Sequence, residues 1–169
     1  MIRYLFLTPA DPSFDPFTFD FDTDPARLVA SGTMIDATST DLAAFRQHGG
    51  KLIMYTGVAD PVFSSNDLAA YYDRLVQAQG SLGRTQRFAR LFLVPGMNHC
   101  SGGPSLDRFD ALSSIVRWVE KGRAPARLEA TGVTFPGRSR PLCPYPTETR
   151  YRGRGDGERA ASFRCVAPE

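Results

Sequence analysis

Short apolar runs and helical apolar periods alternate through the middle of the chain. Residues 51–55 and 90–94 are apolar runs of strand length, and a turn rich in Gly and Pro ends each of them. Residues 66–79 and 105–121 instead repeat apolar positions at the helical spacing, so we expect a helix after each strand. The order strand, helix, strand, helix implies parallel strands joined by a right-handed crossover. The fold class is therefore α/β.

The second expected helix presents four apolar positions that we expect to face inward. These positions are Leu112, Ile115, Val116 and Val119. The first 48 residues predict two short helices, one from an Asp24 N-cap to Ile35 and one from Ser39 to the pair Gly49-Gly50. Residues 123–169 are rich in Pro and Gly, and only short pieces such as 130–135 resemble strands. We therefore expect connecting helices at 1–48, an α/β core at 49–122 and a tail packed on that core at 123–169.

Composition narrows the class of protein. A chain of 169 residues with 42% hydrophobic and 22% charged residues is typical of one globular domain. The net charge of +2 is too small to predict a nucleic-acid partner. No apolar run approaches the roughly 20 residues that cross a bilayer, and the opening MIRYLFLTPADP lacks the apolar region of a secretory signal. We expect no membrane partner and no signal peptide in this chain.

Two polar residues follow the two expected strands. Asp60 comes shortly after the first and His99 shortly after the second, 39 positions later. Because the carboxyl ends of parallel strands meet at one edge of a sheet, both side chains should lie there. An Asp that binds one imidazole nitrogen leaves the other free to take a proton from a hydroxyl nucleophile. Asp60 before Pro61 is equally typical of a turn, and we interpret His48 as the structural end of a surface helix.

The nucleophile for such a pair is missing from the sequence. No GxSxG elbow occurs: Ser101 lies beside His99 in sequence, and Ser64-Ser65 lack the flanking glycines. Cys100 is chemically possible, but a residue adjacent to its own base usually points away from it. A zinc site made of Asp60, His99 and Cys100 lacks the usual paired spacing.

A calcium loop is also a weak hypothesis. Asp20, Asp22 and Asp24 have the spacing of its first three ligands, but Pro25 replaces the required Gly and Ser31 the required Glu. We therefore predict no metal site.

Seven segments in order resemble the tannase and feruloyl esterase family of α/β-hydrolases. They are FTFDFD (17–22), GGKLIMY (49–55), GVADP (57–61), LVPGMNHC (93–100), FDAL (109–112), RPLCPYP (140–146) and ASFRC (161–165). Each segment alone is a weak signal, but the ordered set covers nearly the whole chain. The resemblance implies a partial α/β-hydrolase fold that holds its last parallel strands, their helices and a disulfide-closed tail.

The resemblance also implies roles for the site residues. Asp60 is the acid and His99 the base of a Ser-Asp-His triad whose Ser lies outside this chain. Cys100 pairs with an absent Cys beside that Ser, and Cys143 pairs with Cys165, although other pairings are possible. Residues 1–48 include the trailing edge of a lid domain, whose missing part is the place for any calcium. No cofactor is implied in this chain.

The implied protein is the C-terminal part of a secreted or periplasmic serine esterase. It acts on aromatic esters of the feruloyl or galloyl type, and this fragment alone should be inactive without the missing N-terminal portion. Two other hypotheses remain: a non-catalytic α/β binding module, and a structural domain of a secreted protein stabilised by its cysteine-bearing tail.

Overall fold

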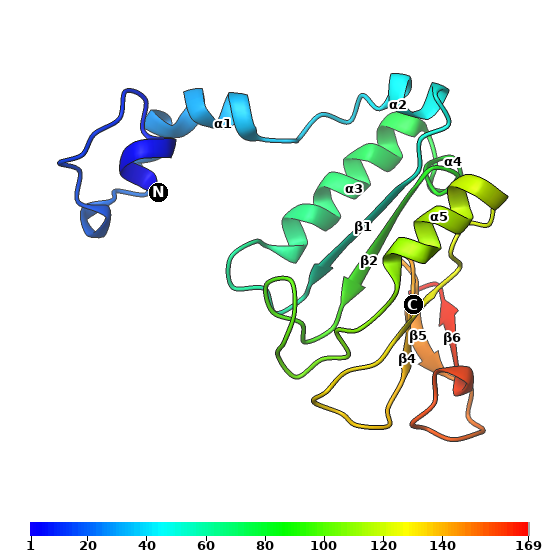
Figure 1. Cartoon of the computed structure of the whole chain (residues 1–169). Helices are drawn as coiled ribbons and strands as arrows, with labels where there is room; N and C mark the ends of the chain where they lie inside the picture. The colour runs from blue at the N-terminus through cyan, green and yellow to red at the C-terminus, as the bar shows by residue number, and fades with distance from the viewer. Residues whose placement is uncertain (169) are drawn as a thin grey trace. The chain divides into compact units, whose positions relative to one another are not determined.

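A computed structural model describes residues 1–168. The chain folds as two compact units (Figure 1). The first is Met1–Ser39, and the second begins at Thr40. The assignment of 1–48, 49–122 and 123–169 to lid edge, core and tail concerns roles in a larger enzyme and stays a prediction.

The first unit consists of short helices around a polar loop. They are η1 (Ile2–Phe6), η2 (Pro16–Thr18), η3 (Asp24–Leu28) and α1 (Val29–Ile35). The expected helix up to Ile35 is present, but its first part is a 3-10 helix and Thr23, not Asp24, precedes it. Asp24 instead accepts the backbone N–H of Asp20 and binds Arg27 at 3.1 Å. The Asp24 carboxylate therefore binds donors of its own chain.

A parallel pair of strands forms the centre of the second unit. β1 (Leu52–Gly57) pairs with β2 (Ala89–Val94) in a register that runs from Leu52 opposite Ala89 to Gly57 opposite Val94. The crossover contains α3 (Ser65–Gln79) and α4 (Leu82–Thr85), while α2 (Ala43–Gln47) precedes β1. Ser64 caps α3, and Gly80 ends it with φ +81°. The predicted α/β class is confirmed.

The two faces of this sheet bury separate apolar clusters. On one face, α3 packs against the strands through Tyr72, Leu75, Phe88, Ala89 and Leu91. The Tyr72 hydroxyl donates to the Ala89 carbonyl at 2.9 Å, and burial raises its pKa to about 12. On the other face, the cluster consists of Phe92, Val94, Met97, Leu128, Ala130 and Leu142. Alternating side chains of β2 thus serve both clusters.

The second long helix differs from the sequence prediction in both length and orientation. α5 spans Ala111–Lys121, not 105–121, because the Asp110 carboxylate caps it by accepting the Ser113 N–H at 2.8 Å. Its buried side is formed by Ser114 and Trp118, with Arg90 over the Trp118 ring. Three of the four expected inward residues are exposed instead: Leu112, Val116 and Val119, by 75%, 41% and 59%. We call these three residues the α5 stripe.

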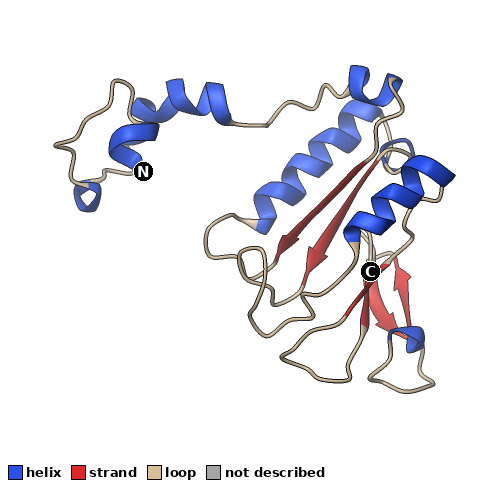
Figure 2. Cartoon of the chain, viewed as in Figure 1, coloured by secondary structure: helices blue, strands red, loops and turns tan. Residues whose placement is uncertain are grey.

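The C-terminal tail forms two small antiparallel sheets beside β2 (Figure 2). β3 (Leu128–Ala130) pairs with β4 (Arg140–Leu142), and β5 (Glu148–Tyr151) pairs with β6 (Phe163–Val166), preceded by η4 (Ala160–Ser162). A bridge between Phe92 and Pro144 joins the tail to the free edge of β2. Cys143 and Cys165 form a disulfide with Cα atoms 5.5 Å apart. The predicted disulfide-closed tail is confirmed.

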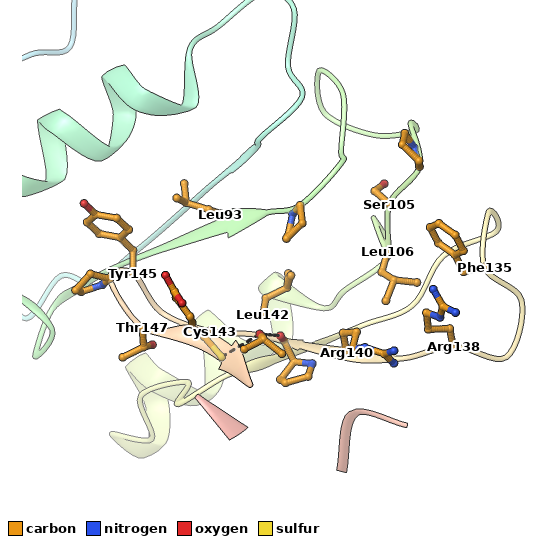
Figure 3. Close-up of a pocket in the computed structure, with 16 residues that line it drawn as sticks. Leu93, Ser105, Leu106, Phe135, Arg138, Arg140, Leu142, Cys143, Tyr145 and Thr147 are labelled. Atoms are coloured by element: carbon orange, nitrogen blue, oxygen red, sulfur yellow. Dashed lines mark hydrogen bonds between the residues drawn. The ribbon is translucent and has the colours of Figure 1, made fainter. Parts of the chain in front are cut away.

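A cavity of about 520 Å³ lies between β2, the loop after it and the tail (Figure 3). Leu93, Leu106, Phe135 and Leu142 make much of its wall apolar. Arg138 and Arg140 also line it, but both bind Glu158, Arg138 through two nitrogens at 2.5 and 3.1 Å. These ion pairs link β4 and the segment before it to Glu158 within the tail.

Candidate active site

Asp60 and His99 meet at the carboxyl edge of the β1–β2 pair. Asp60 lies three residues after β1 and His99 five residues after β2. His99 Nδ1 lies 2.9 Å from Asp60 Oδ2. Because an ionised carboxylate only accepts hydrogen bonds, this contact requires the proton of the neutral imidazole to be on Nδ1. The sequence predicted this juxtaposition, and the structure contains it.

Both oxygens of the Asp60 carboxylate accept hydrogen bonds. Its side chain is 5% exposed. Oδ1 accepts the backbone N–H groups of Val62 at 2.7 Å and Phe63 at 3.1 Å, while Oδ2 accepts His99. Burial acts to raise the pKa of Asp60, but these hydrogen bonds outweigh it and lower the pKa below its ordinary value. The carboxylate is therefore ionised and cannot rotate without losing a donor.

The His99 side chain is exposed to solvent, whereas that of Asp60 is buried. Its side chain is 45% exposed, and the Phe63 ring lies 5.2 Å from the imidazole, centre to centre. Asp60 holds Nδ1, which leaves Nε2 as the nitrogen that can accept a proton from a nucleophile. The contact therefore orients the ring and keeps Nε2 open to a proton donor.

The loop that carries His99 has a conformation fixed by glycines and hydrogen bonds. Gly96 and Gly103 have φ of +71° and +80°, and a Cβ on Gly96 would lie 2.4 Å from the Pro104 carbonyl oxygen. The Gly102 N–H donates to Asp107 Oδ2 at 2.7 Å, and the Thr134 hydroxyl donates to the Gly103 carbonyl at 3.1 Å. Hydrogen bonds within the chain and positive-φ glycines therefore set the shape of this loop.

The remaining sequence candidates have other environments. Cys100 is an exposed free thiol with φ +64°. Ser64 caps α3 through the Asp67 N–H, and His48 Nδ1 lies 2.7 Å from the Ala44 carbonyl within its own helix end. In residues 1–168, no three His, Cys, Asp or Glu side chains are grouped to hold a metal ion. Nor does that part of the chain contain a helix long and apolar enough to cross a membrane.

The two interpretations of Asp60 turn out to be compatible. One oxygen makes the turn that Asp-Pro predicts, and the other binds the imidazole. Sequence reasoning missed the amides of Val62 and Phe63 and the ring of Phe63 beside His99. The signal for the Val62 amide was present in the Asp60-Pro61 pair, because an Asp at the start of such a turn commonly accepts the amide two residues ahead.

Comparison with known proteins identifies the family. The tannase and feruloyl esterase family matches residues 2–166. The mono(2-hydroxyethyl) terephthalate hydrolase of Piscinibacter sakaiensis is 50% identical over 96% of this chain and 30% of its own length. A probable feruloyl esterase of Arthroderma benhamiae is 33% identical over 92% of this chain and 31% of its own. The crystal structure of feruloyl esterase B from Aspergillus oryzae superimposes with a TM-score of 0.81 at 27% identity.

Each of these matches covers nearly all of this chain but only part of the relative. The match to the Aspergillus structure covers 98% of this chain and 36% of the Aspergillus chain. The chain therefore spans about a third of the length of the relatives that it matches. Since the family match extends over almost every residue, this chain belongs to the tannase and feruloyl esterase family.

Proposed function

We propose that this chain is the C-terminal part of a serine carboxylic-ester hydrolase. Asp60 and His99 are the acid and the base of its Ser-Asp-His triad, and the Ser belongs to a part of the enzyme outside these 169 residues. The observation that carries the proposal is the 2.9 Å contact between His99 Nδ1 and Asp60 Oδ2 at the sheet edge. A buried, ionised acid behind an exposed imidazole is the arrangement that activates a hydroxyl.

In this mechanism His99 moves protons and Asp60 does not. Nε2 of His99 takes the proton of the Ser hydroxyl as the oxygen attacks the ester carbonyl. Asp60 stabilises the imidazolium that forms, and it stays ionised because three donors hold it. His99 then gives the proton to the departing alcohol, and it later activates water to release the acid from the Ser.

The names of the relatives support a proposal for the substrate class. Terephthalate and ferulate are both aromatic carboxylates, and the relatives that bear these names match this chain across both strands and both site loops. We propose that the ester cleaved here has an aromatic acid of the feruloyl or galloyl type. The disulfide in the tail supports export of the enzyme to an oxidising compartment, either outside the cell or in the periplasm.

The rest of the enzyme would pack on surfaces that are uncovered in this chain. Within residues 1–168, β1 pairs with β2 on one edge only, and Tyr55 on β1 is 47% exposed. The α5 stripe adds three exposed apolar side chains. An apolar helix face and an open strand edge are typical of a surface that another part of the fold covers. In the proposed enzyme, Cys100 forms a disulfide with a Cys beside the Ser.

The test is reconstitution of hydrolysis from two parts. The 169-residue chain alone should release no alcohol from feruloyl or galloyl esters, and the N-terminal portion of the enzyme should restore turnover. In the restored enzyme, His99→Ala should lower kcat about a millionfold and Asp60→Asn about ten-thousandfold. His48→Ala is the matched control and should leave turnover unchanged.

Three outcomes would count against the proposal. Alcohol release by the isolated chain that His99→Ala abolishes would reveal a nucleophile within these residues. Turnover of the restored enzyme that is insensitive to His99→Ala would remove His99 from the mechanism. If no N-terminal portion restores turnover, the non-catalytic binding module is the better interpretation of the exposed apolar surfaces.

A further inference from the structure

The loop that carries His99 crosses the last residue of β1 at very short range. A Cβ added to Gly57 would lie 2.1 Å from the Met97 carbonyl oxygen and 2.5 Å from that of Asn98. Both atoms belong to the backbone, so no side-chain rotation could relieve the overlap. The φ of Gly57 is outside the left-handed region. Glycine is therefore needed here for space and not for its own backbone conformation.

Contacts on both sides prevent the crossing from opening. The Val58 N–H donates to the Val94 carbonyl at 3.0 Å, and the Ala59 N–H donates to the Met97 carbonyl at 3.1 Å. The Met97 side chain is 1% exposed and belongs to the core cluster with Phe92 and Val94. The loop is thus tied to β1 by its backbone and to the core by Met97.

We propose that Gly57 is a positioning residue for the Asp60–His99 pair. The lack of a side chain lets the two loops approach until His99 Nδ1 reaches Asp60 Oδ2. Asp60 is three residues beyond Gly57 and His99 two residues beyond Met97, so the crossing is the common base of both loops. The catalytic meaning of this positioning rests on the function proposed above, but the geometry does not.

The size of the overlap decides what a substitution would do. Real Cβ contacts do not fall below 3.0 Å, so the Met97 carbonyl would have to move by about 0.9 Å. Because Met97 is anchored in the core, much of that movement passes to Asn98 and His99. Hydrogen bonds weaken steeply beyond about 3.2 Å, so a 2.9 Å contact does not survive a shift of this size.

The tautomer of His99 provides the test in the 169-residue chain itself. Long-range ¹H–¹⁵N NMR, at a pH where the ring is neutral, should show the proton on Nδ1 in the parent chain. Gly57→Ala should give a mixture of both tautomers, as should Asp60→Ala, which removes the acceptor. Gly83→Ala is the matched control, because a Cβ there meets nothing within 4 Å and φ is ordinary. It should leave the proton on Nδ1.

A folded Gly57→Ala chain that keeps the proton on Nδ1 would overturn the proposal. If this variant does not fold, Ala59→Pro decides instead, because it removes the donor to the Met97 carbonyl without adding an atom at Gly57. An unchanged tautomer in Ala59→Pro would also overturn it. A parent chain without the Nδ1 proton would refute the pair itself and therefore both proposals.

Turnover separates the two proposals further. In the restored enzyme, Gly57→Ala should lower kcat about 100-fold with KM unchanged, since a misplacement near 1 Å costs roughly that much. Should His99→Ala leave turnover intact while Gly57→Ala still shifts the tautomer, the proposed function fails and the positioning role stands. Wild-type kcat in Gly57→Ala would contradict the positioning role alone.

Discussion

Asp60 shows how one short side chain organises a site. Its three donors come from the turn that it begins and from a loop 39 residues away. The turn would form without His99, because the two amides bind Oδ1 alone. His99, however, depends on Asp60 for the position of its proton. The position of the His99 proton thus depends on Asp60, whereas the turn at Asp60 does not depend on His99.

Lowering the pH should reduce the free energy of unfolding, in part because Asp60 becomes protonated. Hydrogen bonds lower its pKa below 3.8 in the folded chain, so the ionised form favours folding. That contribution is present above the unfolded pKa and is lost as pH falls through the lower folded pKa. We expect Asp60→Asn to lose less free energy of unfolding between about pH 5 and about pH 3 than the parent, measured by urea titration.

The matched control for this acid effect is an exposed apolar side chain on α5. Leu112→Ala changes no titratable group and should lose as much stability on acidification as the parent does. An Asp60→Asn chain with the parent's acid sensitivity would contradict the assignment of the lowered pKa to its three hydrogen bonds.

Cys100 should react as a single accessible thiol. Of the three cysteines, Cys143 and Cys165 are joined and Cys100 is free and exposed. We expect a thiol reagent to label one cysteine in the native chain and three after denaturation with reductant. Peptide mapping should place the native label on Cys100. A label on Cys143 or Cys165 would contradict this pairing.

At the scale of the element, α3 and α5 use their apolar residues differently. Leu75 on α3 is fully buried against β2, whereas Leu112 on α5 is 75% exposed. The helical period is similar in both, so the difference comes from what each helix meets. α3 has a sheet face beneath it, while the α5 stripe lies beside the face on which Trp118 is buried.

This difference predicts unequal costs for the same substitution. Leu75→Ala should lower the free energy of unfolding by about 2 to 5 kcal/mol, because it leaves a cavity in the core. Leu112→Ala should change it by about 0.5 kcal/mol or less, since the side chain is already in solvent. Urea unfolding of both variants checks the prediction. Equal losses would show that the α5 stripe is covered in this chain.

In the restored enzyme, Leu112 should matter more than it does in the isolated chain. The same Leu112→Ala should weaken association with the N-terminal portion if the α5 stripe is the surface on which that portion packs. Equal affinity of parent and variant would place the contact elsewhere.

At the scale of the molecule, the tail is joined to the core by two kinds of link. The bridge from Phe92 to Pro144 and the Tyr145 N–H to Leu91 carbonyl hydrogen bond attach it to β2. The disulfide closes it on itself across 22 positions. The first link sets where the tail lies, and the second limits the freedom of its unfolded state.

Removing the disulfide should destabilise the chain without changing its fold. Replacing Cys143 and Cys165 together by Ala should cost about 3 kcal/mol, the chain-entropy value for a loop of this length. Thermal or urea unfolding measures the loss, and circular dichroism checks the fold. Cys100→Ala is the control and should shift stability by about 0.5 kcal/mol or less. A double variant as stable as the parent would contradict the role of the closed loop.

The sequence by itself determined the α/β class, the order of the two parallel strands and their helices, and the meeting of Asp60 and His99 at one sheet edge. Apolar runs and helical periods are local signals, and the parallel arrangement follows from chain order. Asp60 and His99 could be paired because both follow strands whose ends must meet. The start of α5 was wrong by six residues, because the Asp110 cap and not the apolar period decides where that helix begins.

Only the tertiary structure decided which residues are buried and how closely the loops approach. The α5 stripe is exposed because the helix is rotated so that Trp118 lies on its buried side. The spacing of apolar residues along the sequence does not determine that rotation. The need for glycine at position 57 depends on a carbonyl 40 residues away in the chain. Contacts between distant segments are set by packing, and packing is a property of the whole fold, not of any local pattern.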